Sequence, residues 1–178
     1  MPVFGHKRRT LVYLQLVKRL DVREKARRSH VHSECYDARG RMGVEVHRVE
    51  YFSTTVKDRP GQAFNVLSQL AAAGVNLLAF VAIPLGPESA QFTFFPEQVE
   101  TLQRAAPRAG LILDGPHSAI LIQGDDHVGA LAEVHSKLRL AQINVYAATC
   151  VTDGRGTFGY ILYLRPGDIA PALAALSV

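Results

Sequence analysis

The chain is built from two copies of one sequence unit, because it matches itself when it is shifted by 68 residues. The match aligns residues 58–76 with residues 126–144 and needs no gap. The identical or closely related pairs are Asp58/Asp126, Gly61/Gly129, Val66/Val134, Ser68/Ser136, Leu70/Leu138, Ala73/Ala141, Val75/Ile143 and Asn76/Asn144. A fixed internal period means that each copy forms its own supersecondary unit, so the fold must contain that unit twice.

Size and composition set the class of protein. With 178 residues, 48% of them hydrophobic, the chain can form two small modules that share one globule. Its two cysteines, Cys35 and Cys150, show no paired spacing, which disfavours a disulfide framework or a zinc site and favours a reducing compartment. No apolar run reaches the roughly 18 residues that cross a bilayer, and the charged N-terminus lacks a secretory pattern. We therefore expect a cytoplasmic protein with no membrane span.

Positive charge is concentrated near the N-terminus. Residues 1–48 contain 12 Lys and Arg against 5 Asp and Glu, whereas residues 49–178 contain 8 against 11. The sequence thus predicts a basic N-terminal extension, residues 1–46, on a mildly acidic body. Residues 8–28 have the apolar spacing of a basic amphipathic helix; the alternative is a loosely ordered segment, translated upstream of a start at Met42.

The first copy, residues 47–115, is predicted to have the order β-α-β-β-α-β. A strand at 51–56, rich in β-branched and aromatic residues, ends at a Pro60-Gly61 pair that favours a helix start, and Gly74 ends that helix. Two strands, 75–83 and 91–95, follow around a Pro/Gly turn. A second helix begins at Pro96 and leads to a short fourth strand at Leu111–Leu113.

The second copy, residues 116–178, repeats this order without a fourth strand. It contains strands 118–123, 143–152 and 158–164 and helices 128–140 and 169–176. The missing strand would lie beside the first one, so Ser118–Gln123 would be an open edge unless a second subunit or the strand preceding Tyr51 covers it. The fold class is therefore α+β: two ferredoxin-like units with antiparallel sheets, the second lacking its last strand.

The residues of the loop after the first strand distinguish between the functions that such a unit can have. A metal-carrying unit needs paired cysteines there, and neither loop has any. An acylphosphatase-like enzyme needs a glycine-rich anion cradle with an arginine, whereas Arg59 stands alone and His127 replaces it in the second copy. We therefore predict no enzyme, no metal and no cofactor.

Each loop instead has an aspartate, a glycine three residues later, and an asparagine just after the helix. Helix N-terminal N–H groups attract a carboxylate, and a glycine lets a ligand approach the backbone. An asparagine amide offers donors and an acceptor, which suits a zwitterion, and the aspartate would orient the loop or meet an ammonium group. The candidate ligand-binding residues are Asp58, Arg59, Pro60, Gly61 and Asn76, and Asp126, His127, Val128, Gly129 and Asn144. The alternative for any one of them is a structural role in a cap or turn.

These residues resemble a known family. The run Asp58-Arg59-Pro60-Gly61-Gln62-Ala63-Phe64-Asn65-Val66-Leu67, followed by Ala73-Gly74-Val75-Asn76-Leu77, resembles the signature of the ACT domain, an amino-acid-binding regulatory module. Asp126-His127-Val128-Gly129-Ala130-Leu131 with Ile143-Asn144-Val145 is similar but departs at His127 and Val128. The resemblance covers about residues 47–178. It implies a stand-alone tandem sensor, a homodimer that binds a small amino acid between paired domains and regulates a partner protein.

Two other functions stay open at this stage. The run Phe158-Gly159-Tyr160-Ile161-Leu162-Tyr163 has the aromatic alternation of an RNA-binding strand, but its companion strand has no aromatic residue and the body is acidic, so nucleic-acid binding is disfavoured. The paired units are also compatible with a structural dimerisation module that binds no ligand. Cys150, in a mostly apolar strand, is expected to be buried.

Overall fold

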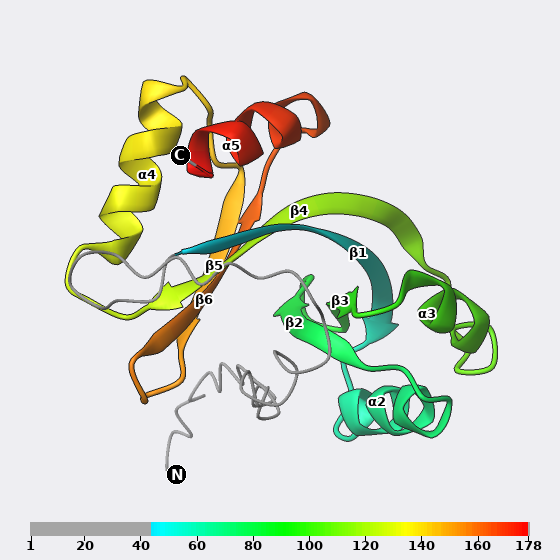
Figure 1. The fold of residues 1–178 in the computed structure, drawn as a ribbon. Helices are drawn as coiled ribbons and strands as arrows, with labels where there is room; N and C mark the ends of the chain where they lie inside the picture. The colour runs from blue at the N-terminus through cyan, green and yellow to red at the C-terminus, as the bar shows by residue number, and fades with distance from the viewer. Residues whose placement is uncertain (1–43, 178) are drawn as a thin grey trace, which may run out of the picture. The chain divides into compact units, whose positions relative to one another are not determined.

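The structure, a computed structural model, describes residues 44–177 (Figure 1). Most of the predicted N-terminal extension therefore lies outside the described residues, including Cys35. The elements in chain order are β1 (Glu45–Lys57), α2 (Gln62–Ala72), β2 (Leu77–Pro84), β3 (Ser89–Pro96), α3 (Val99–Ala105), β4 (Asp114–Asp125), α4 (Ala130–Leu140), β5 (Ala147–Thr152), β6 (Thr157–Tyr163), a short 3-10 turn (Pro166–Asp168) and α5 (Ile169–Leu176).

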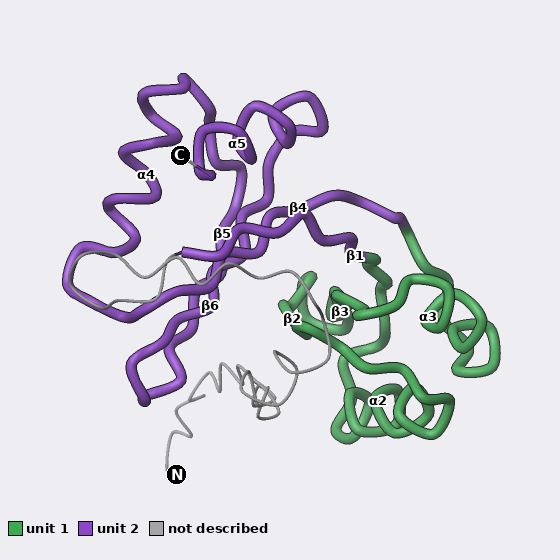
Figure 2. The backbone as a smooth tube through the Cα atoms, viewed as in Figure 1, with its two compact units in different colours: residues 1–16, 52–114 green, residues 17–51, 115–178 purple. Residues whose placement is uncertain are grey.

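The chain divides into two compact units (Figure 2). Of the described residues, unit 1 contains 52–114, and unit 2 contains 44–51 together with 115–177. The division cuts through β1 between Tyr51 and Phe52 and passes the start of β4 between Asp114 and Gly115. The first seven residues of β1 thus belong to the unit formed by the C-terminal part of the chain.

Unit 1 is an antiparallel sheet in the order β2-β3-β1, with α2 and α3 packed on one face. Cross-strand pairs such as Phe52 with Phe94 place alternate aromatic side chains toward the helices. The helices fill that face with Val66, Leu70, Leu102 and Ala105. Alternation in the strands and the 3.6-residue period in the helices therefore meet in one core, as the sequence predicted.

One predicted strand of unit 1 is wrong. Leu111–Leu113 forms no strand, and β4 begins only at Asp114. Ile112 is 89% exposed between two leucines that face the core, so the triplet alternates as a strand does but has no partner strand to pair with. Asp114 accepts a weak hydrogen bond from Ser53 Oγ at 3.4 Å.

Unit 2 has the strand order β1-β4-β6-β5, in which residues 45–51 of β1 supply the strand that the second copy lacks. Arg48 Nη2 donates a 2.9 Å hydrogen bond to Ser118 Oγ, and the rings of Tyr51 and His117 lie 5.2 Å apart. Val46 packs against the core of the unit. Of the two ways to cover the edge at Ser118–Gln123, the structure therefore has the strand preceding Tyr51.

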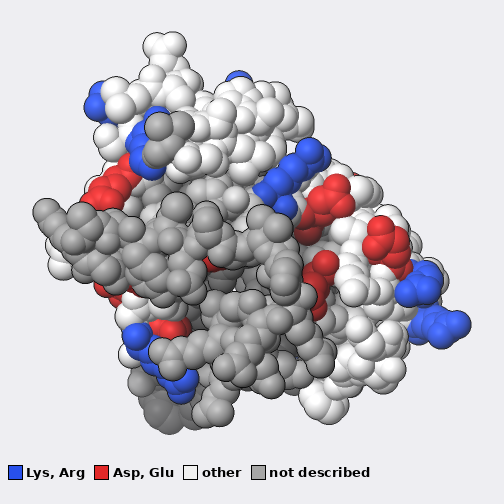
Figure 3. Space-filling view, in the orientation of Figure 1, with Lys and Arg blue, Asp and Glu red and all other residues white. Residues whose placement is uncertain are grey.

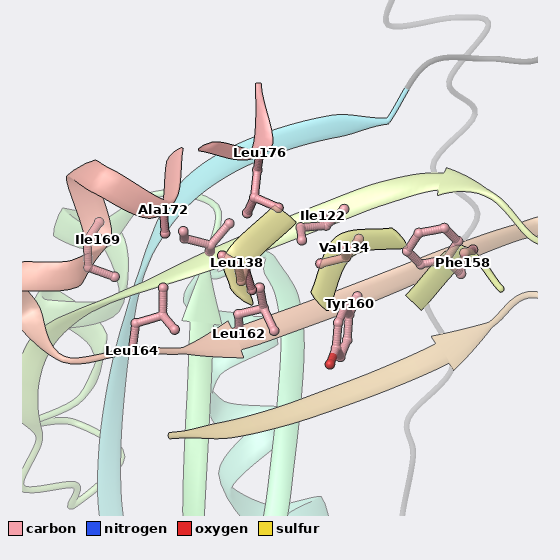
Figure 4. Close-up of a cluster of buried hydrophobic side chains, with 12 residues drawn as sticks. Ile122, Val134, Leu138, Phe158, Tyr160, Leu162, Leu164, Ile169, Ala172 and Leu176 are labelled. Carbon is pink, nitrogen blue, oxygen red and sulfur yellow. The ribbon is translucent and has the colours of Figure 1, made fainter. Parts of the chain in front are cut away.

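The core of unit 2 lies between its sheet and the helices α4 and α5 (Figure 4). Ile120 pairs with Leu162 and Ile122 pairs with Tyr160 across β4 and β6, and their side chains meet Val134, Leu138, Ala172 and Leu176 from the helices. Phe158 and Tyr160 are each only 4% exposed. Phe158 and Tyr160, two of the three aromatic residues of the RNA-like motif, thus pack in the core, where their rings cannot stack on bases.

The internal repeat is present in the backbone as well as in the sequence. Helices α2 and α4 have bounds that differ by the same 68 residues, and so do the first residues of β3 and β6. Gly74 ends α2 with φ +77, and Gln142 adopts φ +57 at the matching position after α4. The turn needs a left-handed residue in both units, which glycine adopts easily and glutamine does not. Among residues 44–177, no helix combines the length and the apolar composition that a membrane crossing requires.

Candidate functional site

The two candidate loops have the same local structure. Gly61 and Gly129 each precede a helix with φ of +85 and +96, and neither helix start receives a side-chain cap. Asp58 N–H donates to Glu88 O at 2.8 Å, and Asp126 N–H donates to Gly156 O at 2.7 Å. Each loop is therefore tied by its backbone to the hairpin turn of its own unit. The carboxylates of Asp58 and Asp126 do not cap the helices, so the structural alternative for these two residues is wrong in that form.

The glycines are required by the backbone and leave open space around them. A Cβ atom added at Gly61 or Gly129 would meet nothing within 4 Å, but the positive φ strains any other residue. The first N–H groups of a helix lack acceptors within the helix. Here the first N–H of each helix donates to its own loop, Gln62 N–H to Arg59 O and Ala130 N–H to His127 O, both at 3.1 Å, and the N–H groups that follow are left for a ligand. These loops can therefore offer backbone donors to a carboxylate.

The other loop residues differ between the units. Arg59 and Pro60 are exposed in unit 1. In unit 2, His127 Nδ1 lies 3.2 Å from Val128 O, and its Nε2 lies 3.9 Å from Glu133 Oε2. The Val128 side chain is fully exposed. Unit 1 thus presents a cation beside its helix start, whereas unit 2 presents an imidazole next to a carboxylate.

Asn76 lies at the opposite end of unit 1 from the loop at 58–61. Lys57, just before the loop, pairs with Ser89, whereas Leu77, just after Asn76, pairs with Pro96. Seven residues along β3 separate these two pairs, which corresponds to roughly 23 Å. The same holds in unit 2, where Asp125 pairs with Thr157 and Ala147 pairs with Tyr163. No single unit therefore brings its asparagine to its own loop.

The two asparagines also differ in their partners. Asn76 Nδ2 donates a 2.7 Å hydrogen bond to Glu97 Oε2, and Glu97 N–H donates to Asn76 O at 3.0 Å. This pair fastens the start of β2 to the end of β3. Asn144 makes no side-chain hydrogen bond with the residues that the structure describes, and the repeat places Arg165 where unit 1 has Glu97. The Asn76 amide is thus held by a carboxylate of its own unit, whereas the Asn144 amide makes no such bond in unit 2.

Unit 2 contains a polar cluster that sequence reasoning missed. His135 Nε2 lies 2.6 Å from Tyr160 Oη, and Cys150 stands directly opposite Tyr160 across β5 and β6. Cys150 was expected to be buried but is exposed, because β5 is the outer strand of the sheet. The partial cover that the protein gives the Cys150 thiol, and then the charge of Asp126, raise its pKa, and burial, followed by the neighbouring Cys150, raises the pKa of Tyr160. The signal that could have found this cluster is the comparison of the two copies at a shift of 68 residues.

Charge and metal-binding potential give little support to other kinds of site. Figure 3 shows positive and negative side chains interspersed over the described part of this face, with no continuous basic stripe there. Within residues 44–177, no three His, Cys, Asp or Glu side chains gather in a way that could hold a metal ion. The loops and the asparagines remain the strongest candidates for ligand binding.

Known proteins are similar to this chain in structure and not in sequence. No protein-family model matches the chain, and no curated protein matches its sequence. Protein BT0572 from Bacteroides thetaiotaomicron is 14% identical with a TM-score of 0.64, over 74% of this chain and 88% of that one. The regulatory subunit of aspartate kinase from Thermus thermophilus, in its ligand-free form, is 18% identical with a TM-score of 0.54, over 77% of this chain and 96% of that one. The corresponding subunit from Thermus flavus is 15% identical with a TM-score of 0.53, with the same coverage.

The chain therefore has the fold of these regulatory subunits, with two ACT-like, ferredoxin-like units in tandem. The resemblance that the sequence indicated and the predicted α+β fold class are both confirmed.

Proposed function

We propose that the chain is a regulatory sensor for a small amino acid and that a second copy of the chain completes each binding site. The observation that carries this proposal is the separation of each loop from the asparagine of its own unit. A zwitterion that needs both groups must bind where two units meet. The chain itself is proposed to have no catalytic activity.

The strand directions are such that pairing of two copies would bring the asparagine of one copy to the loop of the other. In unit 2, β5 is antiparallel to β6 and β6 is antiparallel to β4, so β4 and β5 run in the same direction. Asn144 therefore precedes β5 at one end of the sheet, while the loop at 126–129 follows β4 at the other end. If β5 pairs antiparallel with β5 of a second copy, Asn144 of each copy comes to the end that carries the loop of the other copy. Unit 1 has the same relation between β2, Asn76 and the loop at 58–61.

The outer strands suit this pairing. β2 and β5 are the edge strands, and neither Leu77–Pro84 nor Ala147–Thr152 contains a charged residue. An edge strand presents unpaired N–H and C=O groups, and charges are a common device that prevents its pairing. An edge without charges therefore favours the addition of a strand from another chain.

The bound amino acid would have its two charged ends held by different copies. Its carboxylate would accept hydrogen bonds from the N–H groups at the start of α2 or α4, and its ammonium group would meet the carboxylate of Asp58 or Asp126. The amide of Asn144 from the other copy would add a donor or an acceptor. Such a ligand binds the paired form better than the separate form, which is the requirement for it to regulate a partner protein.

A thermal-shift panel of the twenty amino acids tests binding. A ligand at a hundredfold excess over its Kd stabilises the folded form by about 2.7 kcal/mol, which corresponds to a rise of about 5–10 °C in Tm. The variant Pro60→Asp/Val128→Asp places a negative charge at both exposed loops and should abolish the response. The matched control Leu140→Asp, at the far end of α4 where the side chain is 73% exposed, should keep it. If no amino acid shifts the wild type, the proposal is wrong.

Mixed dimers test whether two copies share a site. In a Pro60→Asp background, chains with Val128→Asp lack a working loop in unit 2, and chains with Asn144→Ala lack the asparagine. Neither homodimer should bind, but a mixed dimer contains one site with both groups intact. Mixing the two inactive variants should therefore restore part of the thermal shift. A mixture that stays inactive while it sediments as a dimer would show that the groups act within one copy or not at all.

A further inference from the structure

Among the apolar positions of unit 1 that are polar in unit 2, three lie next to one another in the fold. At the shift of 68 residues, the pairs are Leu67/His135, Ala82/Cys150 and Phe92/Tyr160. Ala82 pairs with Phe92 across β2 and β3 in the same register in which Cys150 pairs with Tyr160 across β5 and β6. The fold of unit 1 therefore forms without any of the three polar groups, and unit 1 serves as an internal control for what the fold requires.

The three polar residues lie side by side in unit 2. His135 Nε2 lies 2.6 Å from Tyr160 Oη, and their ring centroids lie 5.9 Å apart. Tyr160 is buried, and its hydroxyl oxygen lies at the margin of the core, away from the other labelled side chains (Figure 4). His135 and Cys150 are both exposed. The Tyr160 hydroxyl is thus bonded to one exposed side chain, that of His135, and Cys150 is the exposed residue opposite Tyr160 on β5.

Such a replacement is costly for folding alone. Burying a hydroxyl where unit 1 has only a hydrogen atom destabilises the folded state unless the hydroxyl makes a hydrogen bond. The bond between Tyr160 and His135 offsets this cost and adds little stability beyond it. The phenyl ring of Phe92 fills the equivalent place in unit 1 with no such requirement. The polar groups in unit 2 are therefore better explained by contacts with a ligand than by a contribution to folding stability.

The cluster also lies close to the loop at 126–129. Five residues separate His135 from the start of α4 at Ala130, a rise of about 7.5 Å, and helical side chains lean toward the N-terminus. Cys150 pairs with Tyr160 on β6, and Asp125, just before the loop, pairs with Thr157 three residues further along the same strand, a separation of roughly 10 Å. A ligand held at the loop by its carboxylate could therefore direct its side chain toward His135, Cys150 and Tyr160.

We infer that His135, Cys150 and Tyr160 form a side-chain recognition site in unit 2 that selects an amino acid with a neutral, hydrogen-bonding side chain. This inference rests on the proposed amino-acid binding and adds the class of ligand and the unit that reads it. The hydroxyl, the thiol and the imidazole present both donors and acceptors. Their raised pKa values keep the Tyr160 hydroxyl and the Cys150 thiol protonated, so they offer no counter-charge that would offset the desolvation of a charged side chain.

The test converts unit 2 to the residues of unit 1. In the variant His135→Leu/Cys150→Ala/Tyr160→Phe, affinity for the best neutral polar amino acid should fall at least tenfold, whereas apolar amino acids should bind as well as before or better. Ser136→Ala, the loss of a neighbouring hydroxyl on α4, is the matched control and should leave the ranking unchanged. If the triple variant does not fold, Tyr160→Phe and Cys150→Ala are measured separately, each with an expected loss of severalfold.

Alkylation of Cys150 by iodoacetamide gives a second measurement. In a Cys35→Ser background Cys150 is the single cysteine of the chain. The amino acid that gives the largest thermal shift should slow its alkylation severalfold. An unchanged rate with that ligand bound, an unchanged ranking in the triple variant, or a preference for charged or apolar side chains in the wild type overturns the inference. A wild type that responds to no amino acid overturns the proposed function as well, so the two failures are distinguishable.

Discussion

The two units share a backbone and differ in chemistry. In both, the loop is tied to the hairpin turn by one N–H bond, a glycine with positive φ precedes the helix, and the helix ends in a left-handed residue. The side chains then diverge: Asn76 is bonded to Glu97 in unit 1, whereas Asn144 has no such bond and Arg165 takes the place of Glu97 in the repeat. The loop and turn geometry therefore recurs in both units, whereas the hydrogen bonding of the two asparagines does not.

The largest expected effect tests whether the two cores are equivalent. Leu70 and Leu138 occupy matching positions and are each 1% exposed. Leu70→Ala and Leu138→Ala should each lower the free energy of unfolding by about 2–5 kcal/mol, because each removes buried methyl groups and leaves a cavity. Denaturant unfolding followed by circular dichroism measures this loss. Leu140→Ala, at an exposed position of α4, should stay within about 0.5 kcal/mol of the wild type, and a larger loss there would contradict the assignment of the core.

The next largest effect on stability is expected at alkaline pH, where Tyr163 of unit 2 titrates and its counterpart in unit 1 does not. Burial, with a smaller contribution from Tyr51, raises the pKa of Tyr163 from 10.0 to about 12, and the matching residue in unit 1 is Phe95. A raised pKa means that the protonated phenol is favoured in the folded state, so this stabilisation is complete below pH 10 and is lost as pH rises through 12. The loss should be on the order of 1–2 kcal/mol, after a discount for the part of the ring that water reaches.

Tyr163→Phe is the control for this pH dependence. The variant should be less sensitive than the wild type between about pH 9 and pH 12, because Phe carries no titrating group. Unfolding by denaturant at several pH values, together with the ultraviolet absorbance of tyrosinate, measures both stability and ionisation. An identical pH dependence in the variant would rule out Tyr163 as the source.

Exchanging the residue types that follow α2 and α4, Gly74 and Gln142, should change the free energy of unfolding by a smaller amount, with opposite signs in the two units. Gln142 has φ +57, where a side chain costs about 1 kcal/mol, and Gly74 holds the matching position with φ +77. Gln142→Gly should raise the free energy of unfolding by about 0.5–1 kcal/mol, and Gly74→Gln should lower it by a similar amount. Thermal unfolding measures both. Changes of the same sign would show that the two turns are not equivalent.

The fold was largely predictable because its signals are local. Pro60 and Gly61 predict a helix start, Gly74 predicts its end, and the repeat doubles each signal. The strand predicted at Leu111–Leu113 does not form, because strand formation depends on a partner strand as well as on the alternation of apolar residues. The predicted burial of Cys150 is wrong for a related reason, because apolar neighbours in the sequence do not indicate that β5 is the outer strand.

The candidate site was predictable only in its parts. The loop geometry follows from glycine and its neighbours, and the structure has it in both units. The separation of Asn76 from Asp58 follows instead from the direction of the strands, which no single residue encodes. The hydrogen bond between His135 and Tyr160 joins residues 25 apart in the chain and depends on how α4 packs on β6. Site residues that come from one segment are therefore visible in the sequence, and those that come from several elements are not.

The smallest expected effect on stability belongs to the residue that most distinguishes the units. Tyr160→Phe gives unit 2 the ring that unit 1 has in Phe92 and removes the hydroxyl that is bonded to His135. The exposed imidazole can bond to water instead, so we expect a change of about 0.5 kcal/mol or less in the free energy of unfolding, measured by denaturant titration. A loss above about 1.5 kcal/mol would mean that the hydroxyl stabilises the fold. A small change in stability together with a severalfold loss of amino-acid affinity is the combination that a recognition role requires, because the hydroxyl would then contribute to the bound state and hardly at all to the free one.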